Sequence, residues 1–208
     1  MRDLPADLCV LTGDYHFHLH GASEEAYPVM ERIVGSIRAR HGIVGVLGNH
    51  DGRETAPELE KLGVRMLVNC AHEIRRGGDS LWALGLDDPH YYGCDDLAGT
   101  LSDVPGDAFK VLLVHTPELV QEAAARGVDL YLCGHTHGGQ VRVPGMKPRL
   151  VNTRLGVELH HGPWRYHGMK GYTSAGVGCS VAPVRFFCPP EITLIELVRM
   201  GSAPVMAE

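Results

Sequence analysis

Short apolar runs alternate along the chain with stretches in which apolar residues recur at helical spacing. The apolar runs predict strands at 8–12, 43–47, 64–68, 72–76, 80–86, 110–114, 128–133, 171–175 and 192–198. Helical spacing predicts helices over 26–37, 57–62 and 117–125, with Pro28 in the first turn of the first helix, where proline is tolerated. Strands and helices that alternate without a repeat or a linker predict a single α/β domain over residues 1–208.

Residues with metal-binding or acid–base chemistry follow four of these predicted strands directly. They are Asp14, Asn49-His50-Asp51, His115 and His135-Thr136-His137. One such residue is weak evidence, because Gly-Asp is often a turn and a lone histidine is often a buried, hydrogen-bonded side chain. Since the carboxyl ends of parallel strands line one edge of a sheet, the four segments together predict a single site.

The composition narrows the classes of protein to which the chain can belong. With 208 residues and a formal net charge of −6, it lacks the basic surface of nucleic-acid-binding proteins. Six cysteines without a C-x-x-C pair indicate reduced thiols and a cytoplasmic location. No apolar run reaches the roughly 18 to 20 residues of a membrane span. Thirteen histidines are consistent with metal or acid–base chemistry.

Four motifs in this order resemble those of the calcineurin-like metallophosphoesterase family. They are GD (13–14), GNHD (48–51), VHTPE (114–118) and GHTHGGQ (134–140), and the resemblance runs over residues 7–197. PVRFFCPPEITLIEL (183–197) is similar to the bacterial branch that includes membrane-associated phosphoesterases and UDP-2,3-diacylglucosamine hydrolases. The resemblance implies a two-sheet β-sandwich flanked by helices, in four αββα layers. It also implies a phosphorylated small molecule or lipid head group as substrate, and a place at the periphery of the inner membrane.

The resemblance further implies a site for two divalent ions, Mn, Fe, Zn or Ni. The implied ligands are Asp14 bridging both ions, Asn49, His115 and His135 on the second ion, and His137 on the first. His50 would protonate the leaving group, and Asp51 would hold the ring of His50. Carboxylate, amide and imidazole ligands together suit these ions better than Mg or Ca. The implied reaction is hydrolysis of a phosphoester or phosphoanhydride by a metal-bound hydroxide, without a covalent enzyme intermediate.

The chain departs from the family pattern at its beginning. The family has an earlier strand that ends in Asp-x-His and supplies most ligands of the first ion, whereas only thirteen residues precede Asp14. We therefore expect a chain truncated at its amino end, without the first strand, and a first ion that Asp14 and His137 bind weakly or not at all. An anchor or export signal upstream of Met1 would change the expected location.

Three histidines follow Asp14 at alternate positions, and the first has a candidate role. His16 is a possible substitute for a missing ligand, while His18 and His20 are expected at the rim of the site or in solvent.

A histidine-rich stretch further along the chain is expected to be a loop. Within it Trp164, Arg165 and His167 are candidates for substrate binding, with a plain surface loop as the equal alternative.

Two other functions stay open at this point. One is a catalytically impaired relative that serves as a metal-binding interaction scaffold, which the absent Asp-x-His favours. The other is a metal-storage protein, which the placement of the histidines at strand ends disfavours.

Overall fold

The computed structural model describes residues 5–17, 26–145, 148, 151–154 and 157–199. A three-stranded parallel sheet in the order β1-β2-β3 is formed by β1 (Cys9–Leu11), β2 (Ile43–Gly45) and β3 (Val64–Met66). A six-stranded sheet has the order β4-β5-β6-β7-β9-β8. Its strands are β4 (Cys70–Arg76), β5 (Asp79–Gly85), β6 (Lys110–Leu113), β7 (Leu130–Cys133), β8 (Gly162–Tyr166) and β9 (Met169–Thr173).

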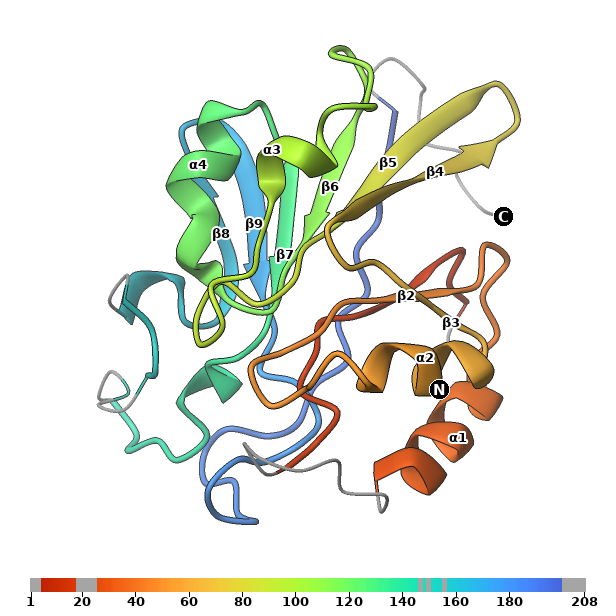
Figure 1. Cartoon of the computed structure of the whole chain (residues 1–208). Coiled ribbons are helices and arrows are strands. Elements are labelled where there is room, and N and C mark those ends of the chain that lie inside the picture. The colour runs from red at the N-terminus through yellow and green to blue at the C-terminus, as the bar shows by residue number, and fades with distance from the viewer. Residues whose placement is uncertain (1–4, 18–25, 146–147, 149–150, 155–156, 200–208) are drawn as a thin grey trace, which may run out of the picture.

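Helices cover the outer side of each sheet (Figure 1). The small sheet carries α1 (Ala26–Ser36) and α2 (Thr55–Lys61), and the large sheet carries α3 (Leu97–Thr100) and α4 (Val120–Ala125). Short 3₁₀ turns occur at η1 (Pro117–Leu119), η2 (His137–Gly139) and η3 (Val157–Leu159). The layers are therefore α/β/β/α, which confirms the sandwich that the resemblance implied.

Three apolar clusters hold these layers together. The cluster between the two sheets consists of Val44, Val46, Leu67, Ile74, Ala83, Val111, Leu113 and Leu130. A second cluster joins α1 and α2 to the small sheet, and a third joins α3 and α4 to the large one. Full burial of a Val, Leu or Ile side chain stabilises a fold by about 1.5–3 kcal/mol, so the inter-sheet cluster keeps the two sheets in a defined register.

Strand direction brings the ends of both sheets to one edge of the molecule. β5, β6, β7 and β9 run parallel to one another, while β4 and β8 are antiparallel to their neighbours. β1 and β2 are also parallel, and their carboxyl ends meet those of the large sheet, because His115 after β6 contacts Asp14 after β1.

Two segments differ from the sequence expectation. The expected loop of residues 160–167 contains β8, because residues 162–166 pair along their whole length with β9. The strand expected at 192–198 belongs to neither sheet, and its apolar side chains Ile192, Leu194 and Val198 are exposed. Within the part of the chain that the structure describes, β1 has a strand partner on one side only, β2.

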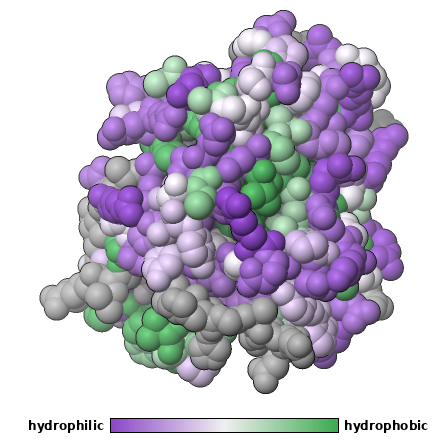
Figure 2. Space-filling view, viewed as in Figure 1, coloured by the Kyte–Doolittle hydropathy of each residue, from purple (hydrophilic) through white to green (hydrophobic). Residues whose placement is uncertain are grey.

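The face of the molecule seen in Figure 2 is mainly hydrophilic, with small apolar areas between the polar side chains. Among the described helices, none has both the length and the apolar character needed to cross a membrane.

Tyr131 on β7 links the sheet to the segment that follows His115. Its buried hydroxyl donates to the carbonyl oxygen of Thr116 at 2.7 Å and accepts from the amide of Leu119 at 3.3 Å. We expect Tyr131→Phe to lower the free energy of unfolding by about 1–3 kcal/mol, because two buried backbone groups lose their partner. Denaturant unfolding measures this loss, and Tyr92→Phe, at an exposed ring, is the control. Equal stability of both variants would contradict the assignment.

Candidate metal centre

Three side chains from three strand ends converge at the shared edge of the sheets. They are Asp14 after β1, His115 after β6 and His135 after β7, and one ligand atom of each lies within 4.8 Å of the others. Nε2 of His115 is 3.1 Å from Oδ2 of Asp14 and 3.2 Å from Nδ1 of His135. The single site that the four motifs predicted therefore has this group at its centre.

Backbone carbonyl groups hold the outer nitrogen of both imidazole rings. Nδ1 of His115 donates to the carbonyl oxygen of Thr12 at 2.6 Å, and Nε2 of His135 donates to that of Asn152. Because a carbonyl oxygen only accepts hydrogen bonds, each outer nitrogen carries a proton. The inner nitrogens therefore face the interior of the group, which is how metal-binding histidines are oriented in proteins. Nε2 of His115 carries a proton while it pairs with Asp14, and binding of a cation would release that proton.

Asp14 and His115 form an ion pair that shifts the pKa of both side chains. Burial alone would raise the pKa of Asp14, but the charge of His115 and its hydrogen bond outweigh burial and lower it well below the usual range. Burial alone would lower the pKa of His115, yet the Asp14 carboxylate raises it to about 9. Burial, assisted by the charge of His115, lowers the pKa of His135 to about 3, so that ring is neutral.

Two further predicted ligands carry buried atoms without a hydrogen-bond partner among the described residues. They are Oδ1 of Asn49 and Nδ1 of His137. A buried polar atom without a partner costs free energy unless it binds something else, such as an ion. The donor set of carboxylate oxygen, amide oxygen and imidazole nitrogen fits Mn, Fe, Zn or Ni.

The backbone at these ligands is in an unfavourable conformation. Asp14, His135 and His137 have φ values of 59°, 67° and 50°, in the left-handed region that side chains other than glycine rarely adopt. Such residues cost about 1–3 kcal/mol each and concentrate at functional sites. Gly13 allows the close approach of two strand ends here, since a Cβ on it would lie 2.6 Å from the amide nitrogen of Gly48.

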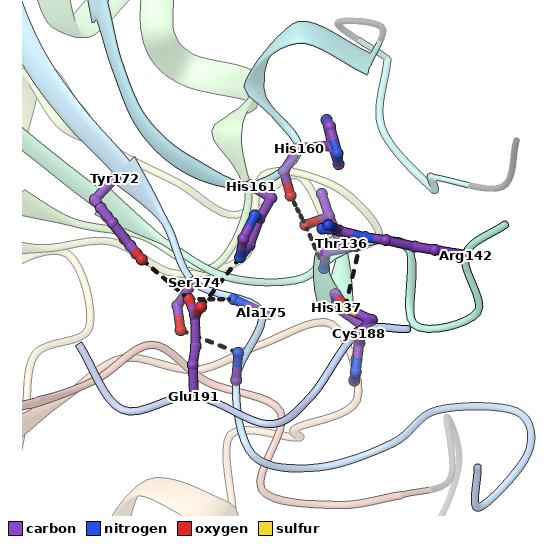
Figure 3. A network of polar contacts seen from close by, with 12 residues as sticks. Thr136, His137, Arg142, His160, His161, Tyr172, Ser174, Ala175, Cys188 and Glu191 are labelled. Carbon is purple, nitrogen blue, oxygen red and sulfur yellow. Dashed lines mark hydrogen bonds and ion pairs between the residues drawn. The ribbon is translucent and has the colours of Figure 1, made fainter. Parts of the chain in front are cut away.

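A network of polar contacts supports the turn that carries His137 (Figure 3). The thiol of Cys188 donates to the carbonyl oxygen of His137 at 3.3 Å, and Thr136 donates its hydroxyl to the carbonyl oxygen of His160. Beside them, Glu191 accepts from the amide of Ala175 at 2.9 Å. The network ties the turn after β7 to His160 before β8 and to Cys188 after β9.

Comparison with curated proteins gives relatives that are longer than this chain, and the matched part is about 68–76% of their length. It is 29% identical to YkuE of Bacillus subtilis (strain 168), named an uncharacterized metallophosphoesterase, over 92% of this chain and 68% of the relative. It is also 29% identical to the phosphodiesterase YaeI of Escherichia coli (strain K12), over 92% of this chain and 70% of that protein. A metallophosphoesterase of Aquifex aeolicus (strain VF5) is 29% identical over 97% and 76%. The chain is homologous to proteins that are named metallophosphoesterases.

Solved structures and family models add less to this relationship. A sulfate thiohydrolase, SoxB, of Thermus thermophilus matches this metallophosphoesterase homologue with a TM-score of 0.52 and 17% identity. The match covers 80% of this chain but only 33% of that structure, and it supports the fold alone. No protein-family model matches the chain.

The expected pairing of Asp51 with the ring of His50 is wrong. Nδ1 of His50 donates instead to the carbonyl oxygen of Phe17 at 3.0 Å. Asp51 is buried and accepts backbone N–H groups from both neighbouring strand-end turns, those of Asp14 and Gly48 at 2.8 Å among them. Its carboxylate fastens the turn after β1 to the turn after β2, and so positions Asp14. Burial first, and then the charge of Asp14, raise the pKa of Asp51 to about 7.

The substitute ligand His16 faces away from the group of three. Its Nε2 lies 3.2 Å from the hydroxyl of Thr55, and its ring packs edge-on against Tyr27 at 5.4 Å between centroids. His16 is buried between α1 and α2, and the metal-binding group of described residues does not include it. His18 and His20 lie outside the described residues.

The three candidate substrate-binding residues do not form a loop at the site. Trp164 packs against Tyr131, with 5.5 Å between ring centroids, and donates its Nε1–H to Thr173. Arg165 is exposed on β8, and His167 lies in the turn between β8 and β9. Since β8 runs antiparallel to β9, its beginning lies at the polar edge and its end, with His167, at the far side. The hairpin register therefore removes Arg165 and His167 from the site.

One more strand end reaches the site, and the sequence argument missed it. The parallel strand β5 leads into Asp88-Pro89-His90, and the ring of His90 lies 4.6 Å from that of His135 between centroids. Nδ1 of His90 contacts Oε1 of Glu118 at 2.6 Å. The sequence contains a hint of this, because a histidine follows a fifth apolar run. The contact of His90 with Glu118, which is 28 positions away, cannot be predicted from the sequence pattern.

A prediction for the metal-free protein follows from the raised pKa of His115. A histidine whose pKa rises from 6.5 to about 9 on folding stabilises the fold below pH 6.5 and loses that contribution as the pH rises through 9. We expect chelator-treated protein to lose up to about 1.4 kcal/mol per pH unit between pH 7 and 9 relative to Asp14→Asn. Denaturant unfolding at several pH values measures the difference. Parallel curves for the two proteins would contradict the Asp14–His115 pair.

A second prediction concerns Asp51. We expect Asp51→Asn to lower the free energy of unfolding by about 1–3 kcal/mol, because an amide NH₂ group cannot accept the backbone N–H groups that the carboxylate accepts. The affinity for divalent metal falls as well, since Asp14 loses its anchor. Calorimetry of unfolding and of metal binding measures both effects, with the exposed Asp107→Asn as control. Unchanged stability and affinity would show that Asp51 does not position Asp14.

Proposed function

We propose that this chain is a metal-dependent hydrolase of phosphoesters or phosphoanhydrides, of the phosphodiesterase or pyrophosphatase type. The observation that carries the proposal is the convergence of Asp14, His115 and His135, in which Nε2 of His115 contacts both the Asp14 carboxylate and Nδ1 of His135. The metallophosphoesterase names of the relatives support the same general chemistry. Convergence from separate strand ends, against backbone strain, is typical of a functional site rather than of chance burial.

The residues divide between two ion positions. In the proposal Asn49, His115 and His135 would hold one ion, His137 would hold the other, and Asp14 would be a ligand shared by both. Bound divalent ions, with Mn foremost, would neutralise phosphoryl oxygens and acidify water. The protein would keep the donors in place through Thr12, Asn152 and Asp51, so that no donor has to move when the substrate binds.

His50 is the proposed proton donor to the leaving group. Its backbone N–H donates to Oδ1 of Asp14 at 3.0 Å, which places the residue directly beside the bridging carboxylate. The ring is held at Nδ1 by Phe17, and Nε2 lies 3.9 Å from Oδ2 of Asp14. Nε2 is therefore the atom that His50 presents to a substrate bound at Asp14.

The proposed substrate is a phosphorylated small molecule or a lipid head group. A relative named a phosphodiesterase supports a phosphodiester as the first substrate to test. All six cysteines are free in the structure, which supports a reducing compartment such as the cytoplasm. A lipid head group is the second proposed substrate, and it would place the protein at the periphery of the inner membrane.

One observation favours a second candidate function, a metal-binding interaction scaffold. Among the described residues, Asp14 and His137 are the two proposed ligands of the first ion, whereas four residues contribute to the second. A first ion held by two ligands binds weakly, and hydrolysis by two ions then fails. Metal binding without turnover would identify this case.

Hydrolysis of bis-p-nitrophenyl phosphate with added Mn²⁺, together with metal analysis of the purified protein, tests the proposal. We expect Asp14→Ala to lose both metal and turnover, because it removes the shared ligand. His50→Ala keeps the metal but loses about 10²–10⁴-fold in kcat, as expected when a proton donor is removed. His72→Ala on β4 is the control. No turnover by the wild-type protein with any divalent ion would reject the hydrolase and favour the scaffold.

A further inference from the structure

Three residues form a polar cluster beside the metal centre, here called the rim cluster: His90, Glu118 and Arg154. They come from the segment after β5, from η1 and from the segment before η3. The cluster touches the metal centre, because the rings of His90 and His135 lie 4.6 Å apart between centroids. None of the proposed ligands or proton donors belongs to it.

Glu118 is the centre of the rim cluster. Its side chain is only 6% exposed, and its Oε1 accepts from Nδ1 of His90 at 2.6 Å and from the backbone N–H of Arg154 at 3.2 Å. Nε of Arg154 lies 3.7 Å from Oε2, which has no hydrogen-bond partner among the described residues. Burial of a carboxylate costs free energy unless a cationic partner compensates it. The buried Glu118 carboxylate therefore needs such a partner, and it holds that partner in place.

The segment around Asp88 is built to hold His90 in position. The Asp88 carboxylate is fully buried and accepts the backbone N–H groups of His90, Tyr91 and Tyr92 at 3.2, 2.6 and 2.9 Å. The carbonyl oxygen of His90 in turn accepts from Nη2 of Arg154 at 2.7 Å. The guanidinium group is therefore fixed from two sides, by a carbonyl oxygen and by a carboxylate.

Arg154 belongs to the same short segment as a support of the metal centre. Two residues before it, the carbonyl oxygen of Asn152 accepts from Nε2 of His135. The Arg154 side chain is 68% exposed although one side of its guanidinium is anchored. An anchored guanidinium with exposed N–H groups is the arrangement with which proteins bind phosphate oxygens, because its planar donors match them.

We propose that Arg154 binds non-bridging oxygens of the substrate phosphate and that Glu118 and His90 position its guanidinium for this contact. This inference rests on the proposed function, since the phosphate is that of the hydrolysed substrate. The substrate then meets metal ions on one side and a permanent cation at the rim. For a chain with a net charge of −6, this cation also attracts an anionic substrate to the site.

The alternative to phosphate binding is a purely structural role, in which the ion pair of Arg154 and Glu118 only holds residues 151–154 in place. A fastening role predicts lower stability and no specific effect on phosphate. A phosphate-binding role predicts weaker phosphate binding in Arg154→Gln with the fold unchanged. Exposed ion pairs contribute about 0–1 kcal/mol to stability, so the exposed Arg154 can be replaced without unfolding the protein.

The test is calorimetric titration of inorganic phosphate into Mn²⁺-loaded protein, together with KM and kcat for bis-p-nitrophenyl phosphate. We expect Arg154→Gln to weaken phosphate binding and raise KM about 10-fold, with kcat and metal content nearly unchanged. Arg126→Gln is the matched control, since Arg126 is an exposed arginine paired with Glu122 on α4. It removes the same charge and leaves all four quantities unchanged.

A double-mutant cycle tests the positioning role of Glu118. We expect Glu118→Gln to weaken phosphate binding in the same direction, and the double variant with Arg154→Gln to be no weaker than Arg154→Gln alone. Additive losses would overturn the positioning role. A KM or a phosphate affinity that Arg154→Gln leaves at the wild-type value would overturn the contact itself. If the wild-type protein shows no turnover, the proposed function is rejected, and the phosphate titration still tests the Arg154 contact. If the wild-type protein does not bind phosphate, the proposed Arg154 contact is overturned as well.

Discussion

The contact between Asp14 and His115 is the interaction on which the rest of the site depends. Asp14 follows β1 of the small sheet and His115 follows β6 of the large sheet, and Nε2 and Oδ2 lie 3.1 Å apart across the junction. A second contact, from Nδ1 of His115 to the carbonyl oxygen of Thr12, crosses the same junction. Both contacts require the register that the inter-sheet apolar core imposes. Packing between the sheets thus sets the geometry of the metal centre.

This arrangement costs free energy, both through the strained backbone of the proposed ligands and through the burial of their side chains. Three of the proposed ligands have positive φ values, and two of them carry an imidazole ring buried for the most part. Carbonyl groups and the Asp51 carboxylate offset part of that cost, because they supply hydrogen bonds to groups that burial removes from water. The inner nitrogens of His115 and His135 contact side chains of the group itself, namely Asp14 and each other. The site is therefore stabilised from the outside.

The local sequence pattern was sufficient to find the side chains that converge at the site but insufficient to find the groups that support them. Asp14, His115 and His135 each follow a buried strand directly, and parallel strands bring their ends together whatever the loops do. The partner of the His50 ring was mispredicted, because Phe17 approaches it from another strand end. Trp164 was a candidate for substrate binding in an expected loop, whereas the pairing of β8 with β9 packs it against the core. His90 was missed as a neighbour of His135 for the same reason, since Glu118, which holds it, is distant in the chain.

The sequence by itself determined the α/β class of the domain and which residue types stand at the strand ends. Those features follow from hydrophobic periodicity and from short-range strand direction, which a linear pattern carries. Only the tertiary structure decided which imidazole nitrogen faces the centre, that Asp51 serves the backbone instead of His50, and that Glu118 gathers His90 and Arg154. These are contacts between side chains and backbone groups of distant segments. Their geometry depends on sheet packing and hairpin register, and no local propensity encodes either.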